Sequence, residues 1–322
     1  MAELIRLLAR DEKARRLRES MRRQLGEFYQ YLEQNDVIEI SLNPNGGVWI
    51  DRLGQPMQCA GEMNADAAEV FIDTIASIHR TTINRDRPIL ECELPLDGSR
   101  FEALVPPVVA APVFSIRRRA SSVYTLAQYV ADGIITDDQK YVIESSVETR
   151  QNTLVTGGAA SGKTTLLNAL IAHLAVAAPD HRLVVIEDMA ELQCDQPNAV
   201  ITHTSDNVDM RMLTRAAMRL RPDRIIVGET RGGECLELLK AWNTGHSGGL
   251  STLHANSTRD ALKRIELLLL EVTENPLPDL ITSAINVVIH IEKRDGIPGR
   301  KVTEILSVAG YRGGEYQVNR LA

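Results

Sequence analysis

The sequence predicts an α/β protein with two domains, a small α+β domain followed by a larger domain built on a mostly parallel sheet. In the first third of the chain, apolar and polar residues alternate, as in antiparallel strands. Beyond residue 137, short continuously apolar runs alternate with helical patterns, which is typical of a parallel sheet covered by helices on both faces. The length of 322 residues agrees with two domains.

The first segment, from Glu3 to Gln34, predicts an amphipathic helix because apolar residues recur at spacings of three or four. That apolar stripe consists of Leu17, Met21, Leu25, Phe28 and Leu32. Eight basic residues lie in the same segment, among them Arg15, Arg16, Arg18, Arg22 and Arg23. Two interpretations stay open: a helix that packs on its own domain, or a basic helix that contacts a membrane surface or a partner.

The next segments complete the small domain. "VIEISLNPNGGVWIDRLGQPMQC" alternates around two turn signals and predicts a β-meander, followed by a helix over Ala65–Arg80 and a β stretch over Ile89–Ile116. We expect this domain to span residues 1–120. Residues 121–136 predict a linker, and residues 137–322 the second domain, whose tail "NVVIHIEKRDGIPGRKVTEILSVAGY" predicts an added hairpin.

Composition excludes several classes of protein. The net charge of -7 and the aromatic content of 4% disfavour nucleic-acid binding through a basic, base-stacking surface. The four cysteines are scattered and form no CxxC pair, which disfavours a zinc site and indicates a reducing compartment. Neither a signal peptide nor an apolar run long enough to span a bilayer is expected. We therefore expect a cytoplasmic location.

One motif predicts nucleotide binding. Gly157 and Gly162-Lys163-Thr164 fit the pattern G-x-x-x-x-G-K-[ST], between a predicted strand and a predicted helix. Backbone N–H groups of such a loop converge on phosphate, the lysine contacts the β- and γ-phosphates, and the threonine hydroxyl faces Mg²⁺. The expected cradle comprises Gly157, Gly158, Ala159, Ala160, Ser161, Gly162, Lys163, Thr164 and Thr165. The pattern does not separate ATP from GTP.

Carboxylates follow two later apolar runs, Glu187-Asp188 after "RLVVI" and Glu229 after "RIIVG". Both are expected at the carboxyl edge of the sheet, where one could hold a Mg²⁺-bound water and the other could activate the attacking water. Spacing leaves these two roles open. His246 and His254 lie in "GHSGGLSTLHAN" and could sense the γ-phosphate. The other histidines are expected to be surface or core residues: His79, His173, His181, His203 and His290.

Three segments narrow the prediction beyond a phosphate loop: "VVIEDMAEL", "MRLRPDRIIVGETRGGE" and "GHSGGLSTLHANS". With "SRFEALVPP" and "FSIRR" in the first domain, they resemble the secretion ATPase superfamily over nearly the whole chain, and most of all its Trb-type conjugal transfer ATPases. The resemblance implies a RecA-like P-loop NTPase domain that hydrolyses ATP with Mg²⁺. The loop "GGAASGKTT" of this chain differs from that of many relatives only in the small residues between the fixed positions.

The resemblance also implies residue roles. Glu187 corresponds to the water-activating acid of the family's Asp box, and Glu229 to a Walker B acid with a metal-water or catalytic role. His246 and His254 correspond to its His box. Arg100 and Arg117 correspond to first-domain arginines that contact the phosphates, as arginine fingers do. Which residue of Arg117–Arg119 reaches phosphate stays open.

Further implications concern assembly. The resemblance implies homo-oligomeric rings of six, inner-membrane components of a conjugative type IV secretion apparatus as partners, and a place on the cytoplasmic face of that membrane, with hydrolysis coupled to domain motion. The alternatives are a type IV pilus motor or type II secretion motor, a RecA-like nucleic-acid translocase, and a scaffold that binds ATP without turnover. No sequence-specific nucleic-acid binding is expected.

Overall fold

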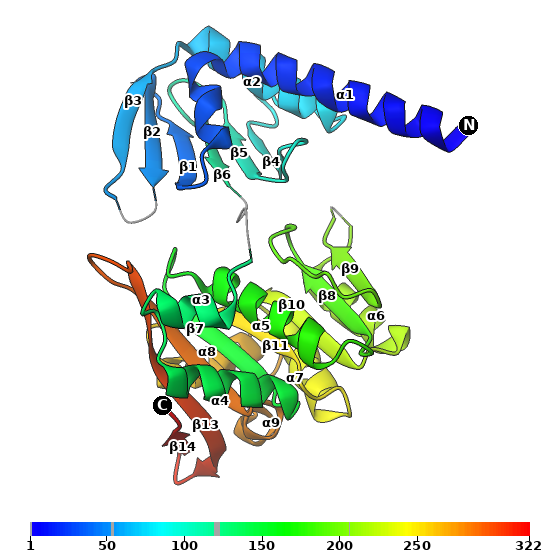
Figure 1. Cartoon of the computed structure of the whole chain (residues 1–322), viewed down its shortest axis with the longest axis vertical. Helices are drawn as coiled ribbons and strands as arrows, with labels where there is room; N and C mark the ends of the chain where they lie inside the picture. Colours follow the sequence, from blue (N-terminus) through cyan, green and yellow to red (C-terminus); the bar gives the residue numbers. More distant parts are fainter. Residues whose placement is uncertain (1, 53–54, 119–122, 206) are drawn as a thin grey trace. The chain divides into compact units, whose positions relative to one another are not determined.

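The computed structural model describes residues 2–52, 55–118, 123–205 and 207–322 (Figure 1). The chain divides into two compact units, Met1–Ser121 and Ser122–Ala322. In the described part of the chain, no helix combines the length and the apolar character needed to cross a membrane.

The first unit is one antiparallel sheet in the order β3-β2-β1-β6-β5-β4. The β-meander predicted from the sequence is confirmed, because β1 pairs with β2 and β2 with β3, all antiparallel. The strands are β1 (Val37–Leu42), β2 (Gly47–Arg52), β3 (Gln58–Glu62), β4 (Ile89–Glu93), β5 (Arg100–Leu104) and β6 (Val113–Arg117); the helices are α1 (Ala2–Leu25), the 3-10 helix η1 (Gly26–Glu33) and α2 (Ala65–Ile78).

Helices cover one face of this sheet. Phe71 of α2 packs edge-on against Phe101 and Phe114, with ring centroids 5.6 Å and 5.3 Å apart. The predicted apolar stripe of the first segment also packs here, because Met21, Leu25 and Phe28 are buried in the core of the unit and Leu17 and Leu32 pack against it. The α-helix is shorter than expected: it ends before Gly26, whose φ of 57° belongs to the left-handed region that commonly ends helices.

The second unit contains an eight-stranded sheet in the order β14-β13-β12-β7-β11-β10-β8-β9. Every pairing from β12 to β9 is parallel, and β13 and β14 extend the sheet antiparallel. The predicted α/β class is therefore confirmed. The strands are β7 (Thr153–Gly157), β8 (Leu183–Glu187), β9 (Ala199–His203), β10 (Arg224–Thr230), β11 (Leu250–His254), β12 (Val287–Lys293), β13 (Arg300–Arg312) and β14 (Glu315–Arg320).

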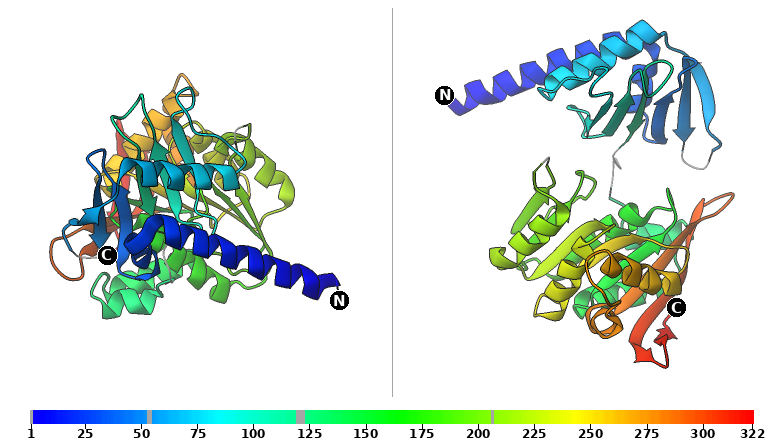
Figure 2. Two further views of the ribbon diagram at one scale, coloured as in Figure 1. Left: turned by 90° about the horizontal axis from the view of Figure 1, so that it is seen from above. Right: turned by 180° about the vertical axis from the view of Figure 1, so that it is seen from behind.

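Helices cover both faces of this sheet, as Figures 1 and 2 show. Neighbouring residues of one strand enter different cores: Val155 packs with α3, α4 and α5, and Leu154 packs with α6 to α9. This burial on both faces explains the continuously apolar strands. The helices are α3 (Leu126–Ala131), α4 (Asp137–Glu148), α5 (Lys163–Ala177), α6 (Met210–Ala217), the 3-10 helix η2 (Met218–Leu220), α7 (Glu234–Asn243), α8 (Thr258–Leu270) and α9 (Pro278–Ala284).

Two segments differ from the sequence prediction. The segment expected as a linker over 121–136 contains α3, whose Leu126 and Tyr129 are buried in the core of the second unit. The tail is more than an added hairpin, because β12 pairs in parallel with the phosphate-loop strand β7 and Val287 and Ile289 belong to the core. In both segments, burial of apolar residues fixes the chain to the second unit.

Candidate functional site

The loop between β7 and α5 has the shape of an anion cradle. Ala160 (φ 55°) and Gly162 (φ 97°) adopt left-handed backbone on either side of Ser161. Alternation of this kind turns successive N–H groups toward one point, at the amino end of a helix. The buried Ser161 Oγ has no hydrogen-bond partner among the described residues, and no atom lies within 4 Å of a Cβ built on Gly158. The loop therefore fits a phosphate group.

The sheet register gathers the other predicted residues at the same edge. In β11, His254 is paired with Gly157 at the end of β7. In β9, His203 is paired with Glu187 at the end of β8. Between β11 and β8 runs β10, which carries Glu229 at its carboxyl end. Parallel strands that end together thus place a lysine-bearing loop, two histidines and two carboxylates along one edge.

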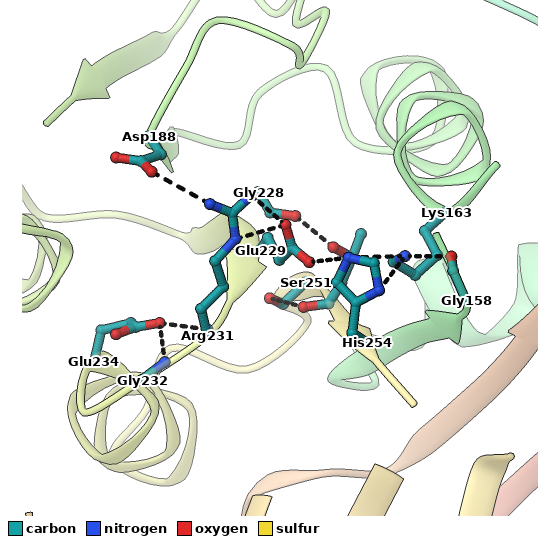
Figure 3. Close-up of polar contacts among 11 residues, drawn as sticks. Gly158, Lys163, Asp188, Gly228, Glu229, Arg231, Gly232, Glu234, Ser251 and His254 are labelled. Carbon is teal, nitrogen blue, oxygen red and sulfur yellow. Dashed lines mark hydrogen bonds and ion pairs between the residues drawn. The ribbon is translucent and has the colours of Figure 1, made fainter. Parts of the chain in front are cut away.

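Lys163, His254 and Glu229 form a continuous chain of polar contacts (Figure 3). The Lys163 ammonium donates to Gly158 O at 2.9 Å and lies 3.2 Å from His254 Nδ1. His254 Nε2 lies 2.9 Å from Glu229 Oε1. Since an ammonium has only donors, the His254 ring accepts from Lys163. The contact between His254 Nε2 and Glu229 Oε1 is close but is not a hydrogen bond of good geometry, because Oε1 has no hydrogen-bond partner among the described residues. The lysine of the loop is therefore connected to Glu229 through one imidazole.

Arg231 holds the opposite side of Glu229. Its Nε and Nη2 donate to Glu229 Oε2 at 2.8 Å and 2.6 Å, and its Nη1 lies 3.4 Å from Asp188 Oδ2. Burial would lower the pKa of Arg231, but the two carboxylates outweigh it and hold that pKa above its ordinary value. Glu234 accepts from the Arg231 and Gly232 N–H groups, which fixes the loop that carries the arginine. The Glu229 carboxylate is thus oriented from both sides.

Glu187 is buried and its two carboxylate oxygens are both engaged. Oε2 accepts from the N–H groups of Glu191 and Leu192 at 2.9 Å and 2.8 Å, and Oε1 lies 3.2 Å from His203 Nε2. Burial raises the pKa of the Glu187 carboxyl, although the two N–H groups and the His203 ring act in the opposite direction. In this arrangement Glu187 fixes the loop that follows β8.

His246 lies apart from this group. It precedes β11, and because β11 runs parallel to β7, its loop lies at the amino edge of the sheet while His254 lies at the carboxyl edge. His246 Nδ1 is 3.3 Å from Ala241 O, and the neighbouring Ser247 O faces Arg150, which precedes β7. The expected pair of histidines at one phosphate therefore does not form within this unit.

The predicted arginines of the first unit are directly opposite each other in neighbouring strands, Arg100 in β5 and Arg117 in β6. Both lie on the face of the sheet away from the phenylalanine core, since Phe101 and Ile116 beside them are buried. Arg118 donates to Gln34 O within the same unit. Arg119 lies outside the described residues.

Two residues of the site were missed by sequence reasoning. His203 was expected to be a surface or core residue and is exposed, with 42% of its side chain accessible, but it also contacts Glu187. Arg231 was assigned no role, although it contacts Glu229 and Asp188. A signal for Arg231 was present: an arginine two residues after a carboxylate at a strand end can reach that carboxylate. No local signal marks His203, because its partner is set by the pairing of β8 with β9.

The donor set fits a Mg²⁺-nucleotide. Thr164 is in the first turn of α5, where its hydroxyl is one of the two expected metal ligands. Glu229 supplies the carboxylate oxygen, 18% of its side chain being exposed. Magnesium prefers oxygen ligands and retains several waters and phosphate oxygens, so one carboxylate and one hydroxyl suffice on the protein side.

The comparisons with known proteins agree with this geometry. Residues 32–294 match the family model described as "Type II/IV secretion system protein". The chain is 48% identical over 291 residues to a protein of Rhizobium radiobacter named conjugal transfer protein TrbB, covering 90% of each chain. It is 31% identical to the type IV secretion system protein PtlH of Bordetella pertussis, covering 85% of this chain and 91% of that one.

Solved structures share the fold. The pilus retraction motor PilT with bound ADP superposes with a TM-score of 0.61 at 17% identity, covering 91% of this chain and 81% of that chain. The ATPase DotB of Legionella pneumophila superposes with a TM-score of 0.60 at 17% identity, covering 90% of this chain and 77% of that chain.

Proposed function

We propose, on the premise that the chain belongs to the family of type II/IV secretion system proteins, that it hydrolyses ATP to power a conjugative type IV secretion apparatus. The observation that carries the ATPase proposal is the chain of contacts from Lys163 through His254 to Glu229, beside a loop with the shape of an anion cradle. The conjugative role is supported by the relatives named as conjugal transfer proteins, at 46% and 48% identity.

The proposed mechanism assigns each residue one task. The loop N–H groups and Lys163 would bind the phosphates, and Thr164 and Glu229 would hold a Mg²⁺ ion, whose charge would offset that of the phosphates. Glu187 accepts the proton of the attacking water; its raised pKa brings the carboxyl closer to the range in which a general base works well. Release of the γ-phosphate changes the partner of Lys163, and His254 passes that change to Glu229.

Assembly and location are part of the same proposal. We infer a homo-hexameric ring at the cytoplasmic face of the inner membrane, docked on membrane components of the apparatus. Opening and closing of the first unit over the nucleotide supplies the mechanical output. Light scattering of the purified chain, with and without nucleotide, measures the molar mass and so tests whether six copies assemble.

The test of ATP hydrolysis uses two substitutions. We expect Lys163→Ala to abolish Mg²⁺-dependent ATP turnover, and Glu229→Gln to lower kcat roughly 10²-fold while ATP still binds, because a catalytic carboxylate is lost. Glu274→Gln, which removes an exposed acid on the same unit, is the matched control and should leave kcat unchanged. Wild-type turnover by Lys163→Ala would overturn the proposed site.

The same variants test the conjugative role. In a donor strain from which the gene has been deleted, the wild-type chain should restore plasmid transfer, and Glu229→Gln should not. Normal transfer by the deletion strain, with a defect in pilus retraction or type II secretion in its place, would instead support the alternative motor function.

A further inference from the structure

The hairpin formed by β12 and β13 packs directly on the phosphate loop. β12 pairs in parallel with β7 as far as His290 opposite Thr156, so Ile291 falls beside Gly157. A Cβ built on Gly157 would lie 2.2 Å from Ile291 O. Only glycine allows this approach, and the start of the loop is therefore fixed against β12. The antiparallel strand β13 starts at this end of the hairpin, with Arg300 opposite Lys293, and then runs away from the loop.

Arg300 reaches the other end of the same loop. A Cβ built on Gly162 would lie 2.5 Å from Arg300 Nη1, 3.2 Å from its Cδ and 3.4 Å from its Cζ. Gly162 is the residue that caps the amino end of α5, next to Lys163. The Arg300 guanidinium therefore lies against the phosphate-binding end of the helix, although the two residues are far apart in the sequence.

The charges around Arg300 favour an anion at this position. The amino end of a helix carries a partial positive charge, and Lys163 adds a full one, so a second cation there is unfavourable without a counter-charge. The guanidinium is half-buried and has no hydrogen bond or ion pair with any residue that the structure describes. On the same hairpin, Arg294 is paired with Glu292 at 2.8 Å.

Two neighbouring groups support the same conclusion. The Ser161 hydroxyl is 2% exposed, has no hydrogen-bond partner among the described residues and lies 2.5 Å from a Cβ built on Gly157, so it is buried in the same loop. Burial raises the pKa of Tyr129, and the nearby Arg300 cation acts in the opposite direction, which locates the guanidinium between α3 and the loop.

We propose that Arg300 binds the α- or β-phosphate of the nucleotide, so that it contributes to the affinity for ADP as well as ATP. The proposal rests on the proposed function, because it assigns a residue to that nucleotide site. The choice of phosphate follows from position: Arg300 contacts Gly162 at the helix end that binds the α- and β-phosphates, whereas Glu229 and His254 lie beyond the Lys163 ammonium.

Binding of two ligands by the full-length chain tests the proposal. The ligands are ADP with a fluorescent ribose label and inorganic pyrophosphate as its competitor. Arg300→Ala should weaken both about tenfold or more, the scale of a lost charge-assisted contact. Arg300→Lys should recover part of the loss, because it keeps the charge without the planar fork. Lys301→Ala removes an equal charge from the adjacent, exposed position and should bind as the wild type does.

The outcomes separate the two proposals. Failure of the wild-type chain to bind labelled ADP would overturn the proposed function, and this inference with it. Wild-type binding that is unchanged in Arg300→Ala would overturn this inference alone. An Arg300→Ala loss for ADP but not for pyrophosphate would also overturn it, because the contact would then be to the base or ribose. If Arg300→Ala melts at a lower temperature than the wild type, Arg300→Lys takes its place in the binding test. Weaker binding of ADP and pyrophosphate by Arg300→Lys than by Lys301→Ala would support the proposal, and equal binding by the two variants would overturn it.

Discussion

At the scale of single residues, the two oxygens of the Glu229 carboxylate contact two different side chains. Arg231 binds Oε2 and His254 faces Oε1, while His254 in turn contacts Lys163. A change at the lysine therefore reaches one oxygen of the carboxylate while the other oxygen stays fixed. This division gives the carboxylate a defined orientation, which a catalytic acid or a metal-water ligand requires.

Substitution of Arg231 tests that orientation. We expect Arg231→Met to lower kcat about tenfold with little change in ATP affinity, because Glu229 loses the two N–H donors that fix it. The kcat of Arg231→Lys should lie between those of Arg231→Met and the wild type, since a single ammonium cannot reproduce the two parallel N–H donors of a guanidinium. Steady-state ATPase rates and nucleotide titrations supply both numbers. Equal kcat for Arg231→Met and the wild type would show that Glu229 does not depend on this arginine.

The positions of some residues could be predicted where a motif fixes the geometry locally. Lys163 and Glu229 lie at the expected edge of the sheet because a glycine loop and a strand-terminal acid each carry their own structural context, while their roles stay predictions. His203 and Arg300 were not found because their neighbours are set by sheet order: β9 pairs with β8, and β13 returns beside β12. Long-range pairing of this kind leaves no periodic signal in the sequence.

At the scale of elements, α3 shows how a predicted linker becomes part of a core. Thr125 and Gln128 form a reciprocal capping box, so the helix has its own start signal. Leu126 and Tyr129 then enter the core of the second unit. The Tyr129 hydroxyl is buried without a partner among the described residues, so the ring rather than the hydroxyl contributes to stability.

Two substitutions at Tyr129 separate these contributions. Tyr129→Ala should reduce the free energy of unfolding of the second unit by about 3–5 kcal/mol, the usual cost of deleting a buried aromatic ring. Tyr129→Phe should leave it within about 1 kcal/mol of the wild type. The chain has two tryptophans, so in a Trp49→Phe background Trp242 of α7 reports the unfolding of the second unit alone. A neutral Tyr129→Ala would mean that the segment behaves as a linker after all.

The strand β11 explains why the two predicted histidines lie far apart. His246 and His254 are eight positions apart, and β11 begins after His246 and ends at His254. A strand that crosses the sheet carries its two flanks to opposite edges, so proximity in sequence implies separation in space. The sequence predicted this strand, and a strand between the two histidines already implies that they lie at opposite edges of the sheet, whichever way it runs.

At the scale of the whole molecule, the two units divide the charged residues assigned to one reaction. The second unit carries the phosphate loop and the carboxylates, and the first carries Arg100 and Arg117 directly opposite each other. Like charges on opposite positions of neighbouring strands are destabilising. Glu93 of β4 and Glu39 of β1 flank the pair in the same row, so each arginine also has a carboxylate on its other side, and the two cations are adjacent at the centre of the row. Such a pair suits an anion with several charges.

Removal of either arginine therefore tests whether the reaction uses both units. We expect Arg100→Ala and Arg117→Ala each to lower kcat at least tenfold while the affinity for ADP stays within twofold of the wild type, because arginines that stabilise the transition state act on the transferred phosphoryl group. Arg23→Ala, at an exposed position of α1, is the matched control in the same unit. Unchanged kcat in both variants would confine the active site to the second unit, and the motion of the first unit would then need another link to hydrolysis.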